Sequence, residues 1–225
     1  MEPYNKKFVP TALGSHNTGA ICWLNSLMQS LLSCPSFTKQ VLESQNDLEK
    51  TEVGMALYNV VSCAMYKHDR FAVTISNLQR KMVKSLLKFG VGQECATEGL
   101  VHLIDLISTE AISKLFTYRV RCYSFCENCK DLQKHGIDYG ITLNLFHITH
   151  PITNDTEFIQ NLKYHNSKTD IKCKCGYLLT RRYYLTMAPP ILVIVFNKFN
   201  NGTGQYIPTS VSLNGTENRI LEYTQ

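Results

Sequence analysis

A single cysteine stands directly before the first strongly periodic helical segment of the chain. Cys22 is followed by apolar residues at helical spacing, namely Leu24, Leu27, Met28, Leu31 and Leu32. A thiolate at a helix N-terminus is stabilised by exposed N–H groups and by the positive end of the helix dipole. The thiolate is the nucleophilic form of cysteine, so this position is suited to covalent catalysis. Taken alone, however, a cysteine beside an apolar helix is more often a small core residue.

The loop before Cys22 carries groups that could assist such a nucleophile. Gly14 and Gly19 permit a tight loop that brings backbone N–H groups close to a substrate carbonyl. Asn17 lies five residues before Cys22 and could donate a hydrogen bond to a developing oxyanion. Cys22 and Asn17 are therefore the candidate catalytic residues.

Two close cysteine pairs form a second pattern. Cys126 and Cys129 make a C-x-x-C motif, and Cys173 and Cys175 make a C-x-C motif later in the chain. Two such pairs on neighbouring β-hairpins would bring four thiolates to one point, which suits tetrahedral Zn²⁺. One pair alone could equally be a redox pair or chance. Cys122 is a possible competing ligand, although its place on a strand favours the core.

The composition limits the compartment and the partners. The chain has 225 residues, nine cysteines and a net charge of +5. Its start, MEPYNKKFVP, lacks the apolar region of a signal peptide, and no apolar run is long enough to span a membrane. We therefore expect reduced cysteines and an intracellular, cytoplasmic or nuclear protein. Cys34, Cys63 and Cys95 are interpreted as ordinary buried cysteines. The basic residues are spread out, which argues against nucleic acid as a partner.

The apolar periodicity predicts a helical first half and a stranded second half. Helices are expected from Leu24 to Leu32 with a stop at Pro35, over about Asp47–Tyr66, and over about Cys95–Ser108. A further helix is expected to start at Ser76, which would form a capping box with Gln79, and to end near Gly90. Strands are expected over Tyr118–Phe125, around Leu143, and over Tyr177–Thr186 and Ile191–Phe199, with a short helix over about Asn154–Leu162. This order predicts an α+β fold with a lobe at 1–115 and a lobe at 116–225.

The segment around Cys22 resembles the Cys box of the ubiquitin-specific proteases, a papain-like cysteine protease family. The pattern G-x-x-N-x-G-x-x-C-[YW]-x-N-S-x-x-Q-x-L is matched without a gap by Gly14, Asn17, Gly19, Cys22, Trp23, Asn25, Ser26, Gln29 and Leu31. A looser match to the Gln-rich box of the family follows at Gln93, Ala96, Glu98 and Leu100, with Cys95 in place of the usual Asp and Gly99 in place of the usual Phe. The resemblance covers about Leu13 to Phe199.

The resemblance implies a papain-like fold with a helical thumb, zinc-finger hairpins and an antiparallel β palm. It implies a cysteine-type deubiquitinase that cleaves the isopeptide or peptide bond after the C-terminal glycine of ubiquitin or a ubiquitin-like modifier. Gln93 and Glu98 would bind substrate, and a structural zinc would be held by Cys126, Cys129, Cys173 and Cys175. We expect a monomer. The C-x-C form of the second pair is closer to the coronaviral papain-like enzymes, and the compact spacing is compatible with a viral member acting in a host cell.

One part of the family pattern is missing. A papain-like enzyme needs a histidine as general base, and in the family it follows the strand that ends here in NKF. The last histidine of this chain is His165. Three interpretations follow: a fragment, a catalytically impaired ubiquitin-binding pseudoenzyme with a structural zinc finger, or an enzyme in which His102 or His16 substitutes. A zinc-ribbon nucleic-acid binder is a weaker alternative.

Overall fold

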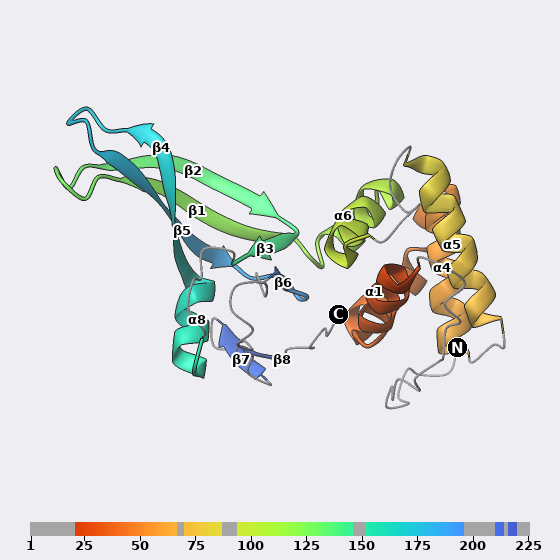
Figure 1. Ribbon diagram of the computed structural model, residues 1–225. Helices are drawn as coiled ribbons and strands as arrows, with labels where there is room; N and C mark the ends of the chain where they lie inside the picture. Colours follow the sequence, from red (N-terminus) through yellow and green to blue (C-terminus); the bar gives the residue numbers. More distant parts are fainter. Residues whose placement is uncertain are drawn as a thin grey trace. The chain divides into compact units, whose positions relative to one another are not determined.

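The computed structural model describes residues 21–66, 70–86, 94–145, 152–195, 210–213 and 216–219 (Figure 1). The chain divides into two compact units, the first ending at Leu115 and the second beginning at Phe116. In the described residues, the first unit consists of helices and the strands lie in the second unit. Among the described residues, no helix is both long and apolar enough to cross a membrane. The α+β class predicted from the sequence is confirmed.

The first unit is built from helices that bury apolar side chains against one another. Its described elements are α1 (Cys22–Leu32), α2 (Pro35–Glu43), α3 (Gln45–Leu48), α4 (Glu52–Met65), α5 (Phe71–Ser85), α6 (Ala96–Ile107) and α7 (Glu110–Ser113). Leu24 and Met28 of α1 are fully buried, as are Leu57 of α4 and Leu78 of α5. Burying apolar side chains at helical spacing is the main contribution that tertiary packing makes to helix stability.

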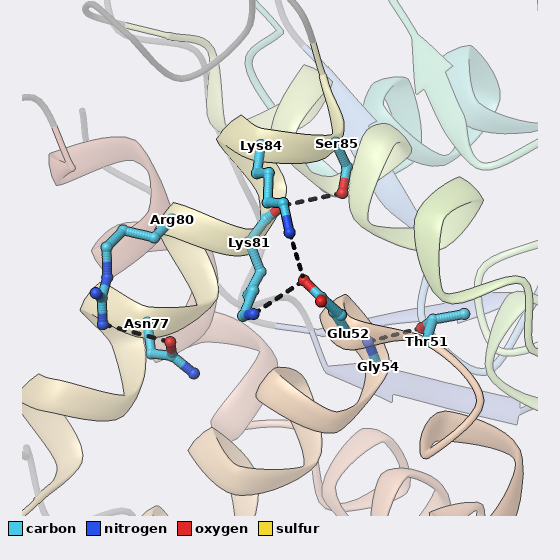
Figure 2. A network of polar contacts seen from close by, with 8 residues as sticks. All are labelled: Thr51, Glu52, Gly54, Asn77, Arg80, Lys81, Lys84 and Ser85. Atoms are coloured by element: carbon cyan, nitrogen blue, oxygen red, sulfur yellow. Dashed lines mark hydrogen bonds and ion pairs between the residues drawn. The ribbon is translucent and has the colours of Figure 1, made fainter.

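A polar network fixes the start of α4 and joins it to α5 (Figure 2). Thr51 is the N-cap of α4, and its Oγ1 accepts a hydrogen bond from the Gly54 N–H at 2.9 Å. Glu52 accepts hydrogen bonds from Lys81 at 2.9 Å and Lys84 at 3.4 Å, both on α5. The hydrogen bond from Lys81, followed by the charges of both lysines, lowers the pKa of the Glu52 carboxyl below its ordinary value. The network therefore ties two helices at the surface of the unit.

Three helix boundaries differ from the prediction. α1 ends at Leu32 before Pro35, as predicted, but Pro35 also starts a further helix, α2, at a position where a missing N–H costs nothing. The single helix predicted over Asp47–Tyr66 is two helices, α3 and α4, separated by the Thr51 cap. The predicted capping box at Ser76 is wrong, since α5 begins at Phe71 and the Ser76 hydroxyl donates to the Ala72 carbonyl inside the helix.

The second unit contains a four-stranded antiparallel sheet in the order β2-β1-β5-β4 (Figure 1). Its strands are β1 (Tyr118–Phe125), β2 (Leu132–Gly140), β4 (Tyr164–Lys172) and β5 (Leu178–Met187). Two long hairpins, β1–β2 and β4–β5, thus join along their inner strands. The register shifts between Cys122 and Tyr123, opposite Gly136, whose φ of +120° favours glycine. The sheet brings the two hairpin ends together.

A small apolar core supports the other end of this unit. β3 (Thr142–Asn144) pairs in parallel with β6 (Val193–Val195). Buried side chains of α8 (Asp155–Lys163) belong to the same apolar cluster as buried side chains of β3. The buried members of this cluster are Leu143, Leu145, Ile152, Phe158 and Leu162. A further hairpin is formed by β7 (Ser210–Leu213) and β8 (Thr216–Arg219).

The strand predictions were partly correct. β1 spans the predicted residues, and β5 and α8 lie within one residue of the predicted segments at each end. Of the strand predicted over Ile191–Phe199, β6 covers Val193–Val195, and residues from 196 onward lie outside the described part. β2 and β4 were not predicted. The parallel pairing of β3 with β6 is a local exception to an otherwise antiparallel architecture.

Candidate active site and metal centre

Cys22 is the first residue of α1 and its side chain is exposed. The residue before it, Ile21, is buried and occupies the N-cap position, and its carbonyl accepts from the Asn25 N–H at 3.0 Å. Trp23, directly after it, is 3% exposed. The helix is therefore anchored on both sides of Cys22, which leaves the thiol in solvent at the positive end of the helix dipole. Asn17, the proposed oxyanion donor, lies outside the described residues.

The first turn of α6 lies against α1 beside this cysteine. Gly99 is buried against the Trp23 indole, and a Cβ built on Gly99 would lie 2.5 Å from Cζ3 and 2.6 Å from Cε3 of that ring. Glu98, one residue earlier, is exposed. Thus one predicted substrate-binding residue lies on the helix that contacts the neighbour of Cys22. The other, Gln93, is outside the described residues.

His102 is the one histidine whose side chain belongs to the described part of the chain. It lies on α6, one turn after Glu98, and is half-buried. It takes part in interactions within the protein. His16 lies outside the described residues. The described residues therefore do not assign a general base to Cys22.

Four cysteines meet at the joined ends of the two hairpins. We call residues 126–129 the first knuckle and residues 173–176 the second knuckle. The sulfur atoms of Cys126, Cys129, Cys173 and Cys175 all lie within 4.8 Å of one another. Across the two knuckles, Cys126 Sγ lies 3.4 Å from Cys175 Sγ and Cys129 Sγ lies 3.5 Å from Cys173 Sγ. None of the nine cysteines of the chain forms a disulfide. The cluster could hold a metal ion.

Tight backbone turns hold both knuckles. The Cys126 N–H donates to the Asp131 carbonyl at 2.9 Å, and the Cys173 N–H donates to the Tyr177 carbonyl at 2.7 Å. In the second knuckle, Gly176 has a φ of +87° and its N–H donates to the Cys173 carbonyl at 2.9 Å. A residue with a side chain would be strained there, so glycine is the natural choice after Cys175.

The electrostatics of the cluster suit a cation. The Tyr177 backbone N–H, followed by the Asn128 side chain, lowers the pKa of the Cys175 thiol to about 6. The Asp131 backbone N–H acts in the same direction on Cys129, but contacts with the other three thiols raise the pKa of Cys129 to about 12. One thiolate therefore forms readily, whereas several together require a positive charge between them. Four thiolates around tetrahedral Zn²⁺ are about 3.8 Å apart, given Zn–S bonds of ~2.3 Å. The residues present fit such an ion.

The remaining cysteines lie apart from this cluster. Cys122 is 8% exposed on β1 and stays in the interior of the sheet, in line with its predicted core role. Cys34 and Cys63 are half-buried, and burial raises the pKa of the Cys34 thiol. The prediction that Cys95 is buried is wrong. Cys95 is exposed because it occupies the N-cap position of α6, where the side chain projects from the end of the helix.

The family model for ubiquitin carboxyl-terminal hydrolase matches residues 13–220. The chain belongs to this family. The match confirms the resemblance that the Cys box indicated, and it includes both the Cys22 helix and the cysteine cluster. No curated protein matches the sequence significantly.

Solved structures support the same fold. A chain of the SAGA DUB module Ubp8/Sgf11/Sus1/Sgf73 bound to monoubiquitin is similar with a TM-score of 0.67 and 18% identity, over 92% of this family member and 55% of that chain. A chain of the same module bound to ubiquitin aldehyde gives a TM-score of 0.63 and 18% identity, over 94% and 51%. This family member thus spans about half the length of the solved structures that it matches.

Proposed function

We propose that this chain carries the nucleophile of a cysteine-type deubiquitinase, with Cys22 as the attacking residue. The observation that carries the proposal is the exposed thiol at the start of α1, inside a chain that belongs to the ubiquitin carboxyl-terminal hydrolase family. The substrate would be ubiquitin or a ubiquitin-like modifier. The two solved structures named above were determined with monoubiquitin and with ubiquitin aldehyde, which supports this substrate class.

The proposed reaction is acyl transfer through a thioester. The Cys22 sulfur attacks the carbonyl carbon of the C-terminal glycine, and the carbon–nitrogen bond to the leaving amine breaks as that amine takes up a proton. Water then hydrolyses the thioester and releases the free carboxylate. Asn17 and backbone N–H groups near Cys22 would stabilise the oxyanion. Glu98 and Gln93 would contact the substrate.

We further propose that the cysteine cluster holds a structural zinc ion. The four sulfur positions and the knuckle turns support this. When bound, the ion would balance the charge of the thiolates and hold the two hairpin ends together. The apolar cluster at this end consists only of Cys126, Cys173 and Leu179 among the described residues. A metal would therefore supply much of the local stability.

The proposed setting is intracellular, in the cytoplasm or the nucleus, and the proposed state is a monomer. Nine cysteines without a disulfide support a reducing compartment. Neither nucleic acid nor a membrane is part of the proposal, since the basic residues form no continuous run in the sequence.

The alternative function is that of a ubiquitin-binding protein with a structural zinc finger and impaired catalysis. This alternative is motivated by the described residues, which assign no general base to Cys22. Both functions predict binding of ubiquitin, but only a working nucleophile forms a covalent bond.

A ubiquitin carrying a C-terminal electrophile separates the two functions. For the enzyme, we expect an adduct on Cys22, located by peptide mass spectrometry. Cys22→Ser should abolish the adduct, whereas Cys95→Ser, at the other exposed thiol of this unit, should keep it. Binding of unmodified ubiquitin without any adduct would favour the alternative function. An adduct on another cysteine, with Cys22 free, would contradict the assignment of the nucleophile.

A further inference from the structure

An arginine on β5 reaches across to the first knuckle. The guanidinium carbon of Arg182 lies 3.7 Å from the centroid of the Phe125 ring. The same side chain donates from Nη2 to Glu127 Oε1 at 2.9 Å. Arg182 is 23% exposed, so most of the side chain is withdrawn from water. Both contacts are stronger when partly desolvated.

These two contacts lie on either side of a proposed metal ligand. Phe125 precedes Cys126 and Glu127 follows it, while Cys126 itself is fully buried. Arg182 belongs to the strand that continues from the second knuckle. Arg182 therefore connects the side chains of the two residues that flank Cys126 to the hairpin that carries Cys173 and Cys175.

A lysine of the same turn lies near the two residues that Arg182 contacts. Lys130 Nζ lies 3.7 Å from Glu127 Oε2 and 6.0 Å from the centroid of the Phe125 ring. Lys130 is an exposed residue in the left-handed backbone region, with a φ of 59°. Exposed ion pairs such as that between Lys130 and Glu127 contribute little to stability. The half-buried Arg182 is thus the stronger connection.

We propose that Arg182 is a positioning residue that orders the first knuckle for metal binding. This inference rests on the proposed zinc site. A planar guanidinium can stack on Phe125 and donate to Glu127 at the same time, which an ammonium group cannot do in the same geometry. Because the residues on both sides of Cys126 are already held, the first knuckle loses less conformational freedom when the metal binds. Loss of partners outside the ligand shell typically weakens metal affinity about 10- to 100-fold.

The test measures zinc affinity on the full chain, by competition with a chromogenic chelator. Arg182→Leu should bind zinc about tenfold more weakly than the unchanged chain. Arg182→Lys should fall between the two, since it keeps the charge and loses the stacking. Arg121→Leu is the matched control, because Arg121 is an exposed arginine of the same sheet that pairs with Ile137 and Tyr184 rather than with the knuckle. It should bind zinc like the unchanged chain.

A second variant separates positioning from general stability. Glu127 is exposed, so Glu127→Gln should leave the fold intact and still weaken zinc affinity. In the Arg182→Leu background, Glu127→Gln should have no further effect, because the shared contact is already gone. Thermal unfolding at saturating zinc should be the same for Glu127→Gln and the unchanged chain. The role of Arg182 would be overturned if Glu127→Gln and Arg182→Leu both bind zinc as tightly as the unchanged chain. If Arg182→Leu fails to fold, unaltered zinc affinity in Glu127→Gln alone would overturn it.

The two proposals fail in different ways. If the unchanged chain binds no zinc, the proposed metal site itself is wrong. If the unchanged chain binds zinc and the variants bind it equally well, the site stands and Arg182 has no part in ordering the first knuckle.

Discussion

Gly99 of α6 lies directly against the indole of Trp23 on α1, and a Cβ at Gly99 would come within 2.5 Å of the Trp23 ring. The family pattern usually has a phenylalanine at this glycine position. Here the Trp23 ring fills the space that a side chain at Gly99 would need. The contact matters because Trp23 follows the proposed nucleophile and Gly99 follows Glu98. It sets how closely the two helices of the candidate site approach.

Gly99→Ala should therefore destabilise the helical unit. In a helix interior, replacing glycine by alanine ordinarily stabilises by about 0.5–1 kcal/mol. The overlap with the Trp23 ring should reverse the sign and give a net loss of about 1–3 kcal/mol. Denaturant unfolding measures the change. In a Trp23→Leu background the ring is absent, so the same substitution should become neutral or stabilising. A gain of stability with Trp23 present would contradict the close contact.

Thr51→Ala should destabilise the chain by about 1 kcal/mol, because it removes the side-chain acceptor for the Gly54 N–H at the start of α4. Thr51→Ser keeps the hydroxyl and should retain most of the stability. Chemical denaturation of both variants provides the comparison. Equal stability of the two would mean that the cap does not determine where α4 begins.

How far the fold could be predicted depends on the apolar pattern of each element. β1 is rich in aromatic and β-branched residues, buries every second side chain from Val120 onward, and was predicted at its full length. β2 and β4 were missed because they are polar strands at the sheet edges, and β2 contains a glycine at a bulge. Their stability comes from pairing with β1 and β5, which a local pattern does not reveal. α2 was missed because Pro35 was interpreted as a stop rather than a start.

The convergence of the cysteines could be predicted from the sequence, whereas the packing contacts around the two candidate sites could not. The spacing of the two cysteine pairs predicted that four sulfur atoms would converge, and those atoms lie within 4.8 Å of one another. Short motifs carry such information because each pair is held by one turn. The contacts of Arg182 with the first knuckle and of Gly99 with Trp23 could not be predicted. They join residues that are distant in sequence, through packing that only the assembled sheet or helix pair defines.

Zinc binding gives a third prediction. The purified chain should contain one zinc ion, and Cys173→Ala should remove it, because Cys173 is a buried member of the cluster. Cys122→Ala is the matched control, since Cys122 is also buried but lies outside the cluster, and it should retain the metal. Elemental analysis measures the stoichiometry. Full zinc occupancy in Cys173→Ala would contradict the ligand set.

Metal removal should affect the two units differently. Trp23, the single tryptophan of the chain, is buried in the helical unit. Treatment with a chelator should therefore reduce the strand signal in circular dichroism while the tryptophan emission stays constant. Readdition of zinc should restore the strand signal. A parallel change in tryptophan emission would show that the units do not unfold separately.

The last prediction concerns turnover. The chain of 225 residues should hydrolyse a fluorogenic ubiquitin substrate very slowly, because no histidine follows His165 and the described residues assign no base to Cys22. A base both activates the thiol and supplies the proton that the leaving amine needs. Its loss typically costs several orders of magnitude in rate, of which an oxyanion hole recovers only a part.

Supplying a segment with a histidine box after the last residue should restore turnover if the site is otherwise competent. Cys22→Ser in the extended chain is the control for the nucleophile and should be inactive. Histidine→Ala within the added segment is the control for the base and should return the rate to that of the original chain. Rapid turnover by the original 225 residues would contradict the prediction. In that case His102→Ala and His16→Ala would identify the base, since a true base affects the pH dependence of the rate as well as its size.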